Sequence, residues 1–304
     1  MPLRAVPDVS WHATDVDGAR VRWLSAGEGD PLVFLHGWGM TPRVYVPAVA
    51  PLTRAGIRVV APALPGFGGS DGPPLRSLGL DAYADRVAAF LDTLALDKPA
   101  FVMGHSLGGG VAIRLAARRP DLVRSLTLVN SVGGAPGRSG MRAGSWWRWA
   151  AGALGEVHPR ALTPGMVAGV VRDVVPNLLR RPVTAAVTAY VALTADLADD
   201  ARLLVDDGLP VLFVWGDRDR LITPGAFSEI ANDMPPEVVA GRHGWLLTEP
   251  DEFATLLHDA LVVHAMLERS RRGASLHAPR DRALFPPERR HRARRGTSGT
   301  RASS

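Results

Sequence analysis

The chain of 304 residues contains no cysteine and a single lysine, Lys98. Without cysteine it has no disulfide, no thiolate metal ligand and no cysteine nucleophile, which is typical of proteins from a reducing compartment. No apolar run approaches the roughly 18 residues that a membrane-spanning helix requires. Residues 1–11 also lack the charged and apolar pattern of a secretory signal. We therefore expect a cytoplasmic protein.

The excess of positive charge is confined to the C-terminal end. The formal net charge is +5, yet residues 269–304 hold eleven arginines against one aspartate and one glutamate. This tail carries +9, and residues 1–268 carry −4. Its Arg-, Pro-, Gly- and Ser-rich composition buries too little apolar surface to offset the entropy of ordering, so we expect disorder.

The basic tail is a weak indicator of a partner. Arginine clusters bind phosphates, but residues 269–304 contain one aromatic residue, Phe285, and no recognisable nucleic-acid-binding pattern. We expect no specific nucleic-acid partner, and at most a weak contact with anionic surfaces. The sequence leaves the oligomeric state open.

Several short runs indicate a mostly parallel, doubly wound sheet. They are largely apolar without alternation, as expected of strands buried on both faces, and they occupy residues 31–35, 57–60, 100–103, 125–129 and 211–215. Helical patterns over 80–96 and 111–119 lie between them, an order typical of parallel α/β folds. Residues 9–27, with Asp17-Gly18 in the middle, predict an antiparallel hairpin.

The regular alternation stops between the strand at 125–129 and the strand at 211–215. Residues 136–205 contain helical patterns and no convincing strand, so we predict a helical insertion after the sixth strand. Residues 1–135 and 206–268 then form the core domain, which a helix over 250–267 closes. The insertion holds three tryptophans close together, and Trp146 and Trp149 share a helical face. We expect them either to anchor the insertion or to line an apolar substrate pocket.

The strongest chemical motif is Gly104-His105-Ser106-Leu107-Gly108. It follows a predicted strand and precedes a predicted helix, which is the setting of a nucleophile elbow. There the serine takes a strained backbone conformation and presents its hydroxyl above the sheet. Since the neighbouring backbone comes close, only glycine fits well at 104 and 108. Ser106 is therefore the predicted nucleophile.

A serine nucleophile requires a base and an acid. Among nine histidines, His243 follows the short strand-like run 237–240 and so lies at the carboxyl end of a strand, where open α/β sheets bind ligands. The run 211–215 ends in Gly216-Asp-Arg-Asp219 and offers two carboxylates. Local physics does not decide between Asp217 and Asp219, and the other one would be a turn or capping residue.

The third requirement is an oxyanion hole of two backbone N–H groups. One would come from Leu107, the residue after the nucleophile. The other would come from the loop His36-Gly37-Trp38-Gly39, with Trp38 N–H as the predicted donor. We expect His36 to hold this loop by hydrogen bonding rather than to act in catalysis.

Taken together, the elbow, the acid and histidine loops, the His36-Gly37 loop and the segment Leu64–Asp71 resemble the α/β-hydrolase superfamily. The resemblance covers about residues 9–267. In that family's pattern the acid stands three residues after the glycine of its turn, which implies Asp219 rather than Asp217. The resemblance also implies that residues 136–205 form a helical cap over the site.

The resemblance implies hydrolysis of a small or medium apolar ester, thioester or lactone through an acyl-enzyme on Ser106. A serine at the elbow argues against the dehalogenase and epoxide-hydrolase branches, which use aspartate. C–C bond hydrolysis of diketone-type substrates is the alternative reaction, and a non-catalytic ligand-binding protein is the alternative of another class. No metal-ligand spacing or nucleotide-binding glycine motif is present, so we expect no cofactor.

Overall fold

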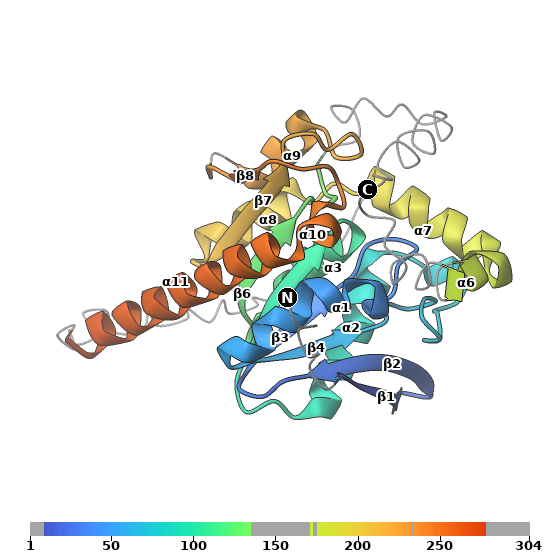
Figure 1. The fold of residues 1–304 in the computed structure, drawn as a ribbon, viewed down its shortest axis with the longest axis horizontal. Helices are drawn as coiled ribbons and strands as arrows, with labels where there is room; N and C mark the ends of the chain where they lie inside the picture. Colours follow the sequence, from blue (N-terminus) through green and yellow to red (C-terminus); the bar gives the residue numbers. More distant parts are fainter. Residues whose placement is uncertain (1–8, 135–170, 173–174, 233, 278–304) are drawn as a thin grey trace, which may run out of the picture. The chain divides into compact units, whose positions relative to one another are not determined.

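A computed structural model describes residues 9–134, 171–172, 175–232 and 234–277 (Figure 1). Trp146 and Trp149 lie outside the described residues, as do residues 278–304 of the predicted tail. Within the described part of the chain, no helix has the length and apolar character needed to cross a bilayer.

An eight-stranded, mostly parallel sheet forms the centre of the fold, as the sequence predicts. Its spatial order is β1-β2-β4-β3-β5-β6-β7-β8. The pairs β1–β2 and β2–β4 are antiparallel, and all later pairs are parallel. The strands are β1 (Val9–Val16), β2 (Ala19–Ala26), β3 (Asp30–Leu35), β4 (Ile57–Pro62), β5 (Ala100–His105), β6 (Val123–Val129), β7 (Val211–Gly216) and β8 (Glu237–Val239).

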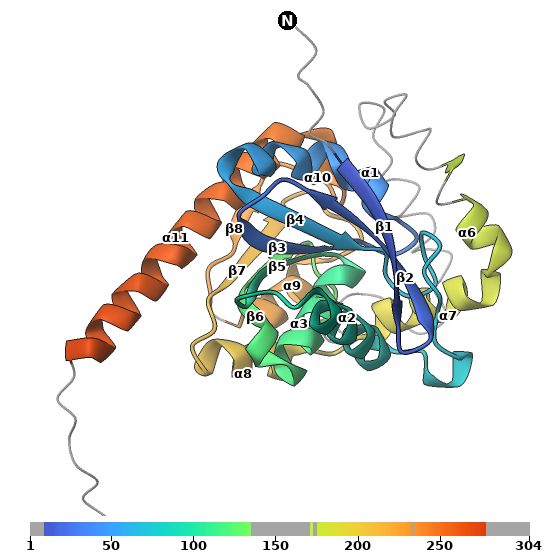
Figure 2. The same cartoon turned by 90° about the horizontal axis from the view of Figure 1, so that it is seen from below.

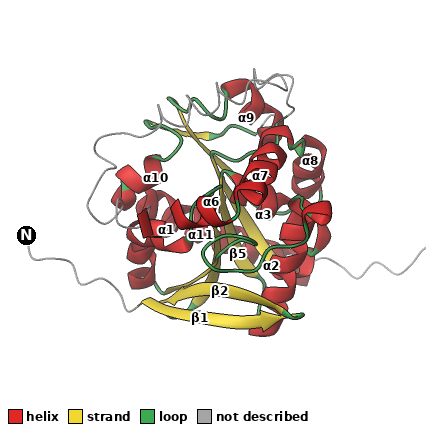
Figure 3. Cartoon of the chain, turned by 90° about the vertical axis from the view of Figure 1, so that its right-hand side faces the viewer, coloured by secondary structure: helices red, strands yellow, loops and turns green. Residues whose placement is uncertain are grey.

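The first two strands form the predicted hairpin at one edge of the sheet (Figure 3). Val16 pairs with Ala19, so the turn consists of Asp17 and Gly18 alone. Both residues have positive φ, 50° and 75°, as a two-residue turn matching the twist of the strands requires.

Helices cover both faces of the sheet. Figure 2 shows α1 and α10 on one side and α2 and α3 on the other. The helices are α1 (Pro42–Val49), α2 (Leu80–Leu94), α3 (Leu107–Arg118), α6 (Val175–Arg180), α7 (Pro182–Thr194), α8 (Ala198–Asp206), α9 (Pro224–Ala231), α10 (Trp245–Thr248) and α11 (Pro250–His277). Short 3₁₀ segments occupy Ala50–Ala55, Leu75–Ser77 and Pro120–Leu122.

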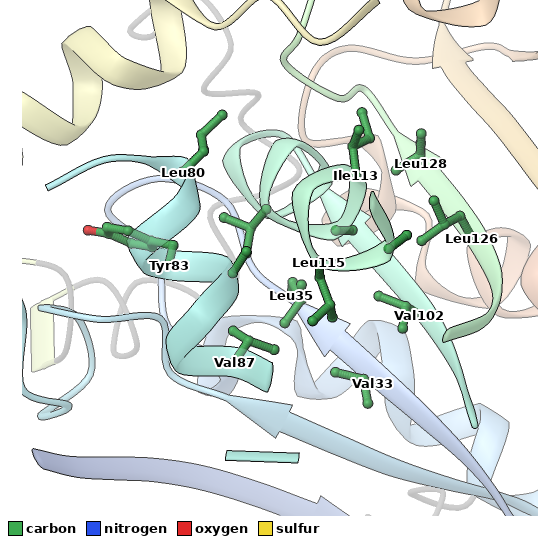
Figure 4. Packing of buried hydrophobic residues seen from close by; sticks show 14 of the residues in the cluster. Val33, Leu35, Leu80, Tyr83, Val87, Val102, Ile113, Leu115, Leu126 and Leu128 are labelled. Atoms are coloured by element: carbon green, nitrogen blue, oxygen red, sulfur yellow. The ribbon is translucent and has the colours of Figure 1, made fainter. Parts of the chain in front are cut away.

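Two apolar clusters, one on each face, hold the layers together. The first joins the sheet to α2, α3, α8 and α9, and the second joins it to α1, α10 and α11. Figure 4 shows part of the first cluster, with side chains from β3, β5 and β6 facing side chains from α2 and α3. Burial on both faces explains why these strands lack alternation in the sequence.

In the described part of the chain between β6 and β7, three helices occupy the region predicted as the helical insertion. The last of them, α8, lies in the predicted range 136–205 except for its final residue, Asp206, yet Ala201 and Leu204 belong to the first apolar cluster. This helix therefore packs on the sheet. In contrast, α6 and α7 expose large apolar side chains, including Leu179 and Tyr190.

One helix was not predicted from the sequence, and another is longer than predicted. Helix α1 contains Pro47 in its interior, and such a proline usually argues against a helix. The helix predicted over 250–267 continues to His277, so the first residues of the predicted disordered tail are helical. The added residues include Glu268, Arg271 and Ala274, which are good helix formers.

Candidate active site

Ser106 stands in a strained turn between β5 and α3. Its φ of 55° and ψ of −119° are unfavourable for any residue with a side chain, and such strain gathers at functional sites. The turn also depends on two close backbone approaches. A Cβ on Gly104 would overlap with the carbonyl oxygen of Gly108, and one on Gly108 would overlap with the carbonyl oxygen of Leu35. This geometry matches the predicted elbow and explains its two glycines.

His243 and Asp219 are brought together by the loops that follow β8 and β7. The distance between His243 Nδ1 and Asp219 Oδ2 is 2.8 Å, and both residues are buried. Because a carboxylate only accepts hydrogen bonds, Nδ1 carries the proton. The neutral ring then has its lone pair on Nε2, the nitrogen that a general base would use.

Four hydrogen bonds hold the Asp219 carboxylate. Oδ1 accepts from the backbone N–H groups of Leu221 and Ile222 at 2.8 and 2.9 Å, and Oδ2 accepts from His243 and from Asn130 Nδ2. Burial acts to raise the pKa of Asp219, but the charge and hydrogen bond of His243, with the Ile222 and Asn130 donors, lower that pKa below its ordinary value. The carboxylate is therefore ionised at neutral pH.

The second aspartate of the loop has a different place. Asp217 Oδ1 accepts from the backbone N–H of Gly241 at 2.9 Å, and the Asp217 N–H donates to Val239 O. The side chain thus ties the loop after β7 to the loop after β8. Of the two aspartates that the sequence offered, Asp219 is the one against His243.

Asn130, at the end of β6, is a site residue that sequence reasoning missed. Its Nδ2 donates to Asp219 Oδ2 at 2.6 Å, and its Oδ1 accepts from Trp245 Nε1 at 3.0 Å. Its φ of 46° is one that asparagine tolerates better than most residues. Its position at the end of the strand next to β7 was the available indication of a contact with Asp219.

The loop after β3 lies against the elbow. A Cβ on Gly37 would lie 3.4 Å from Ser106 Cβ. His36 has the predicted bracing role, because its Nε2 accepts from Leu64 N–H at 2.8 Å and its Nδ1 donates to Gly37 O at 2.9 Å. Burial lowers the pKa of His36 to about 4, so the ring is neutral. Leu107, the other predicted donor residue, is the first residue of α3.

The side chain of Trp38 connects this loop to α7. Its Nε1 donates to Ala185 O at 3.0 Å and to Thr188 Oγ1 at 3.1 Å. The same helix approaches the loop after β4, where a Cβ on Gly66 would lie 3.3 Å from Thr184 Cγ2. Helix α7 therefore contacts the loop that was predicted to supply an oxyanion donor.

Of the predicted site residues, the structure describes Ser106, Asp219, His243, Trp38 and Leu107, all on loops or element ends at the carboxyl edge of the sheet. Trp146 and Trp149 are outside the described residues. Among the residues that are described, no three His, Cys, Asp or Glu side chains group as a metal site requires.

Comparisons with known proteins agree with this geometry. Residues 32–256 match the model of the alpha/beta hydrolase family. A pimeloyl-[acyl-carrier protein] methyl ester esterase from Aromatoleum aromaticum is 33% identical over 261 residues, covering 76% of this chain and 97% of that protein. A dihydrolipoyllysine-residue acetyltransferase component of an acetoin cleaving system from Cupriavidus necator is 36% identical over 233 residues.

The match to the Cupriavidus necator protein covers 73% of this chain but only 60% of that relative. A solved structure of a bacterial membrane phospholipase A, described as a virulence factor, superposes with a TM-score of 0.67 at 26% identity, covering 86% of this chain and 88% of that one. The family match spans most of the described core, including the strand and helix of the elbow and the acid and histidine loops. The chain therefore belongs to the α/β-hydrolase family, whose members include esterases and other hydrolases.

Proposed function

We propose that this hydrolase cleaves carboxylic esters, thioesters or lactones of small or medium apolar substrates through an acyl-enzyme on Ser106. The observation that carries the proposal is the contact of 2.8 Å between His243 Nδ1 and a fully hydrogen-bonded Asp219 beside a strained elbow serine. These are the base, the orienting acid and the nucleophile that acyl transfer requires.

The proposed reaction has two steps. His243 Nε2 takes the proton of Ser106, and Ser106 Oγ attacks the carbonyl carbon to form a tetrahedral oxyanion. The intermediate collapses as the alcohol leaves with the proton from His243. Water, deprotonated by the same imidazole, then releases the acid and restores Ser106. Asp219 keeps the imidazole in the tautomer with Nδ1 protonated and stabilises its charged form.

Backbone N–H groups of Trp38 and Leu107 are the proposed donors to the oxyanion. The close approach of Gly37 to Ser106 supports this role for the loop after β3. Leu107 begins α3, so its N–H is among those at the start of a helix that have no acceptor within the helix. The positive end of the helix dipole adds to the stabilisation of negative charge there.

The test is a panel of acyl esters of increasing chain length, together with a thioester, a lactone and a diketone. We expect turnover of esters and covalent labelling of Ser106 by a fluorophosphonate, with the label blocked by a competing ester. Turnover of the diketone without ester turnover would favour C–C hydrolysis instead. A chain that binds esters without turnover and is not labelled would be a binding protein, and the proposal would be wrong.

A further inference from the structure

A buried chain of hydrogen bonds runs behind the candidate triad. Gly37 N–H and Tyr45 Oη are 3.2 Å apart, Tyr45 Oη and His105 Nδ1 are 2.9 Å apart, and His105 Nε2 and His243 O are 2.9 Å apart. We call this chain the Tyr45–His105 relay. It comes from four separate segments: the loop after β3, helix α1, the elbow and the histidine loop.

The direction of each bond in the relay is fixed. The carbonyl of His243 can only accept, so His105 Nε2 carries the proton. A neutral imidazole then has an acceptor at Nδ1, which must receive the Tyr45 hydroxyl proton. The Tyr45 oxygen is left as the acceptor for Gly37 N–H. Each of the three bonds therefore has one defined donor and one defined acceptor, and a change at either side chain leaves a buried donor or acceptor unpaired.

Burial keeps both side chains of the relay neutral. Tyr45 and His105 are buried, and the loss of solvation lowers the pKa of His105 to about 3. Burial likewise raises the pKa of Tyr45 above its ordinary value. The bond directions therefore persist at neutral pH.

The relay is connected to each part of the candidate site through the main chain of the residues that it joins. Gly37 directly precedes Trp38, the proposed oxyanion donor, and His105 directly precedes Ser106. The bond to His243 is made at its carbonyl, and the ring centroids of His105 and His243 are 4.9 Å apart. A Cβ on Gly37 would lie 3.0 Å from His105 Nδ1 and 3.1 Å from Tyr45 Oη. The loop is therefore packed so closely against the relay that a side chain at position 37 would be crowded.

We propose that Tyr45 and His105 are positioning residues that hold the oxyanion loop and the His243 loop at a fixed separation from Ser106. The proposal rests on the proposed hydrolase function. Neither side chain takes part in proton transfer to substrate. Their effect is on alignment, where a displacement of about 1 Å can cost about 100-fold in rate.

The test compares Tyr45→Phe and His105→Phe with His105→Gln and Phe34→Leu. The first two variants keep aromatic bulk and remove relay bonds. His105→Gln retains an amide N–H for the carbonyl of His243. Phe34, in β3, packs against Tyr45 of α1 with ring centroids 4.9 Å apart but lies outside the relay. Phe34→Leu is therefore the control for a loss of packing against Tyr45.

We expect kcat on an ester with a poor leaving group to fall about 10- to 100-fold in Tyr45→Phe and His105→Phe, with KM nearly unchanged. His105→Gln should recover most of the loss, and Phe34→Leu should lower the melting temperature while keeping kcat near that of the parent. Parental kcat in both Phe variants, or equal kcat losses in Phe34→Leu at the same loss of melting temperature, would overturn the positioning role and leave the ester hydrolase proposal intact.

A second measurement is independent of turnover. The low-field proton signal of His243 Nδ1 bonded to Asp219 should shift or broaden in His105→Phe, recover in His105→Gln and stay unchanged in Phe34→Leu. An unchanged signal in His105→Phe would refute the relay. If the parent hydrolyses no ester and Ser106 is not labelled, the proposed function fails, and this signal still decides the positioning role.

Discussion

The triad region and the helices α6 and α7 are built on opposite principles. Around Asp219 and His243, the polar side chains are buried, and each carboxylate oxygen has two partners. Helices α6 and α7 instead expose large apolar side chains, with Leu179 75% and Tyr190 62% accessible. The proposed catalytic residues are buried in a dense hydrogen-bond network at the edge of the sheet. The helices α6 and α7 of the predicted insertion leave more of their large side chains exposed to solvent.

This contrast indicates that the alignment of the catalytic groups and the choice of substrate depend on different parts of the molecule. A rigid, fully bonded network suits groups that must meet within a fraction of an ångström. A less constrained layer of helices can change its surface without disturbing that alignment. The contact of Trp38 with α7 is where the two regions meet. Variants in each region should therefore have different kinetic effects.

The largest effect is expected at the nucleophile. Ser106→Ala should lower kcat by roughly 10⁴- to 10⁶-fold, because it removes the group that forms the acyl-enzyme. Steady-state hydrolysis of a short ester measures this loss, with unchanged circular dichroism as the control for folding. Near-parental turnover, or fluorophosphonate labelling of another serine, would contradict the assignment.

The next effect separates the two aspartates. Asp219→Asn should lower kcat by about 10³- to 10⁴-fold, because an amide at this position permits the wrong imidazole tautomer. Asp217→Asn is the matched control, since its Oδ1 can still accept from Gly241 N–H. We expect that variant to stay within about threefold of the parent. Equal losses in the two variants would remove the distinction drawn from the geometry.

A smaller effect is expected where the two regions touch. Trp38→Phe keeps an aromatic ring at this position but removes the indole N–H that donates to Ala185 O and Thr188 Oγ1. The oxyanion loop should then be less well fixed, and kcat should fall about tenfold, less than the loss of a whole oxyanion donor. Thr188→Val removes one of the two acceptors and should give a weaker effect in the same direction. An unchanged kcat in both variants would mean that α7 does not influence the loop.

The last effect, on substrate preference rather than on the rate itself, concerns Trp146 and Trp149 of the predicted cap. If they line the substrate pocket, replacing both by Ala should change the preference between long and short acyl chains by about tenfold, with little change in melting temperature. If they anchor the cap, the melting temperature should fall and all esters should lose turnover alike. Parental behaviour in both measurements would contradict the two roles.

The parts of the fold predicted correctly from sequence are those set by local pattern. Unbroken apolar runs identify the parallel strands, and Asp17-Gly18 identifies the hairpin turn, because each depends on neighbours in the chain. Helix α1 escaped prediction because Pro47 opposes a helix locally, and only packing on the second apolar cluster favours it. Tertiary contacts of this kind leave no periodic pattern.

For the site, the sequence indicates residue types and loop ends but not every partner. Ser106 and His243 follow from the elbow and from the strand before the histidine. The contact of Asn130 with Asp219 joins residues 89 positions apart, and that of Tyr45 with His105 joins residues 60 apart. Such pairs depend on the pairing of β6 with β7 and on the placement of α1 against the end of β5, which no single stretch of sequence encodes.

Two of the buried histidines of the site region, His36 and His105, also set an acid limit for the folded protein. In the unfolded chain, histidine binds a proton near pH 6.5, whereas burial lowers the pKa of His36 to about 4 and that of His105 to about 3. Below pH 6.5 the unfolded state therefore binds more protons than the folded state. Their stabilising contribution is complete above pH 6.5 and is lost as the pH falls toward 3–4.

Each of these histidines should lower the free energy of unfolding by about 1.4 kcal/mol per pH unit within that window. Urea unfolding at pH 7 and pH 5 measures the slope, and His105→Gln should reduce it by about half, because glutamine does not titrate. Equal slopes in the parent and this variant would contradict the buried, neutral state of His105. The buried histidines that order the site thus make the stability of the whole fold depend on pH. The acid end of the pH range in which the protein can work is therefore limited by residues that do not contact substrate.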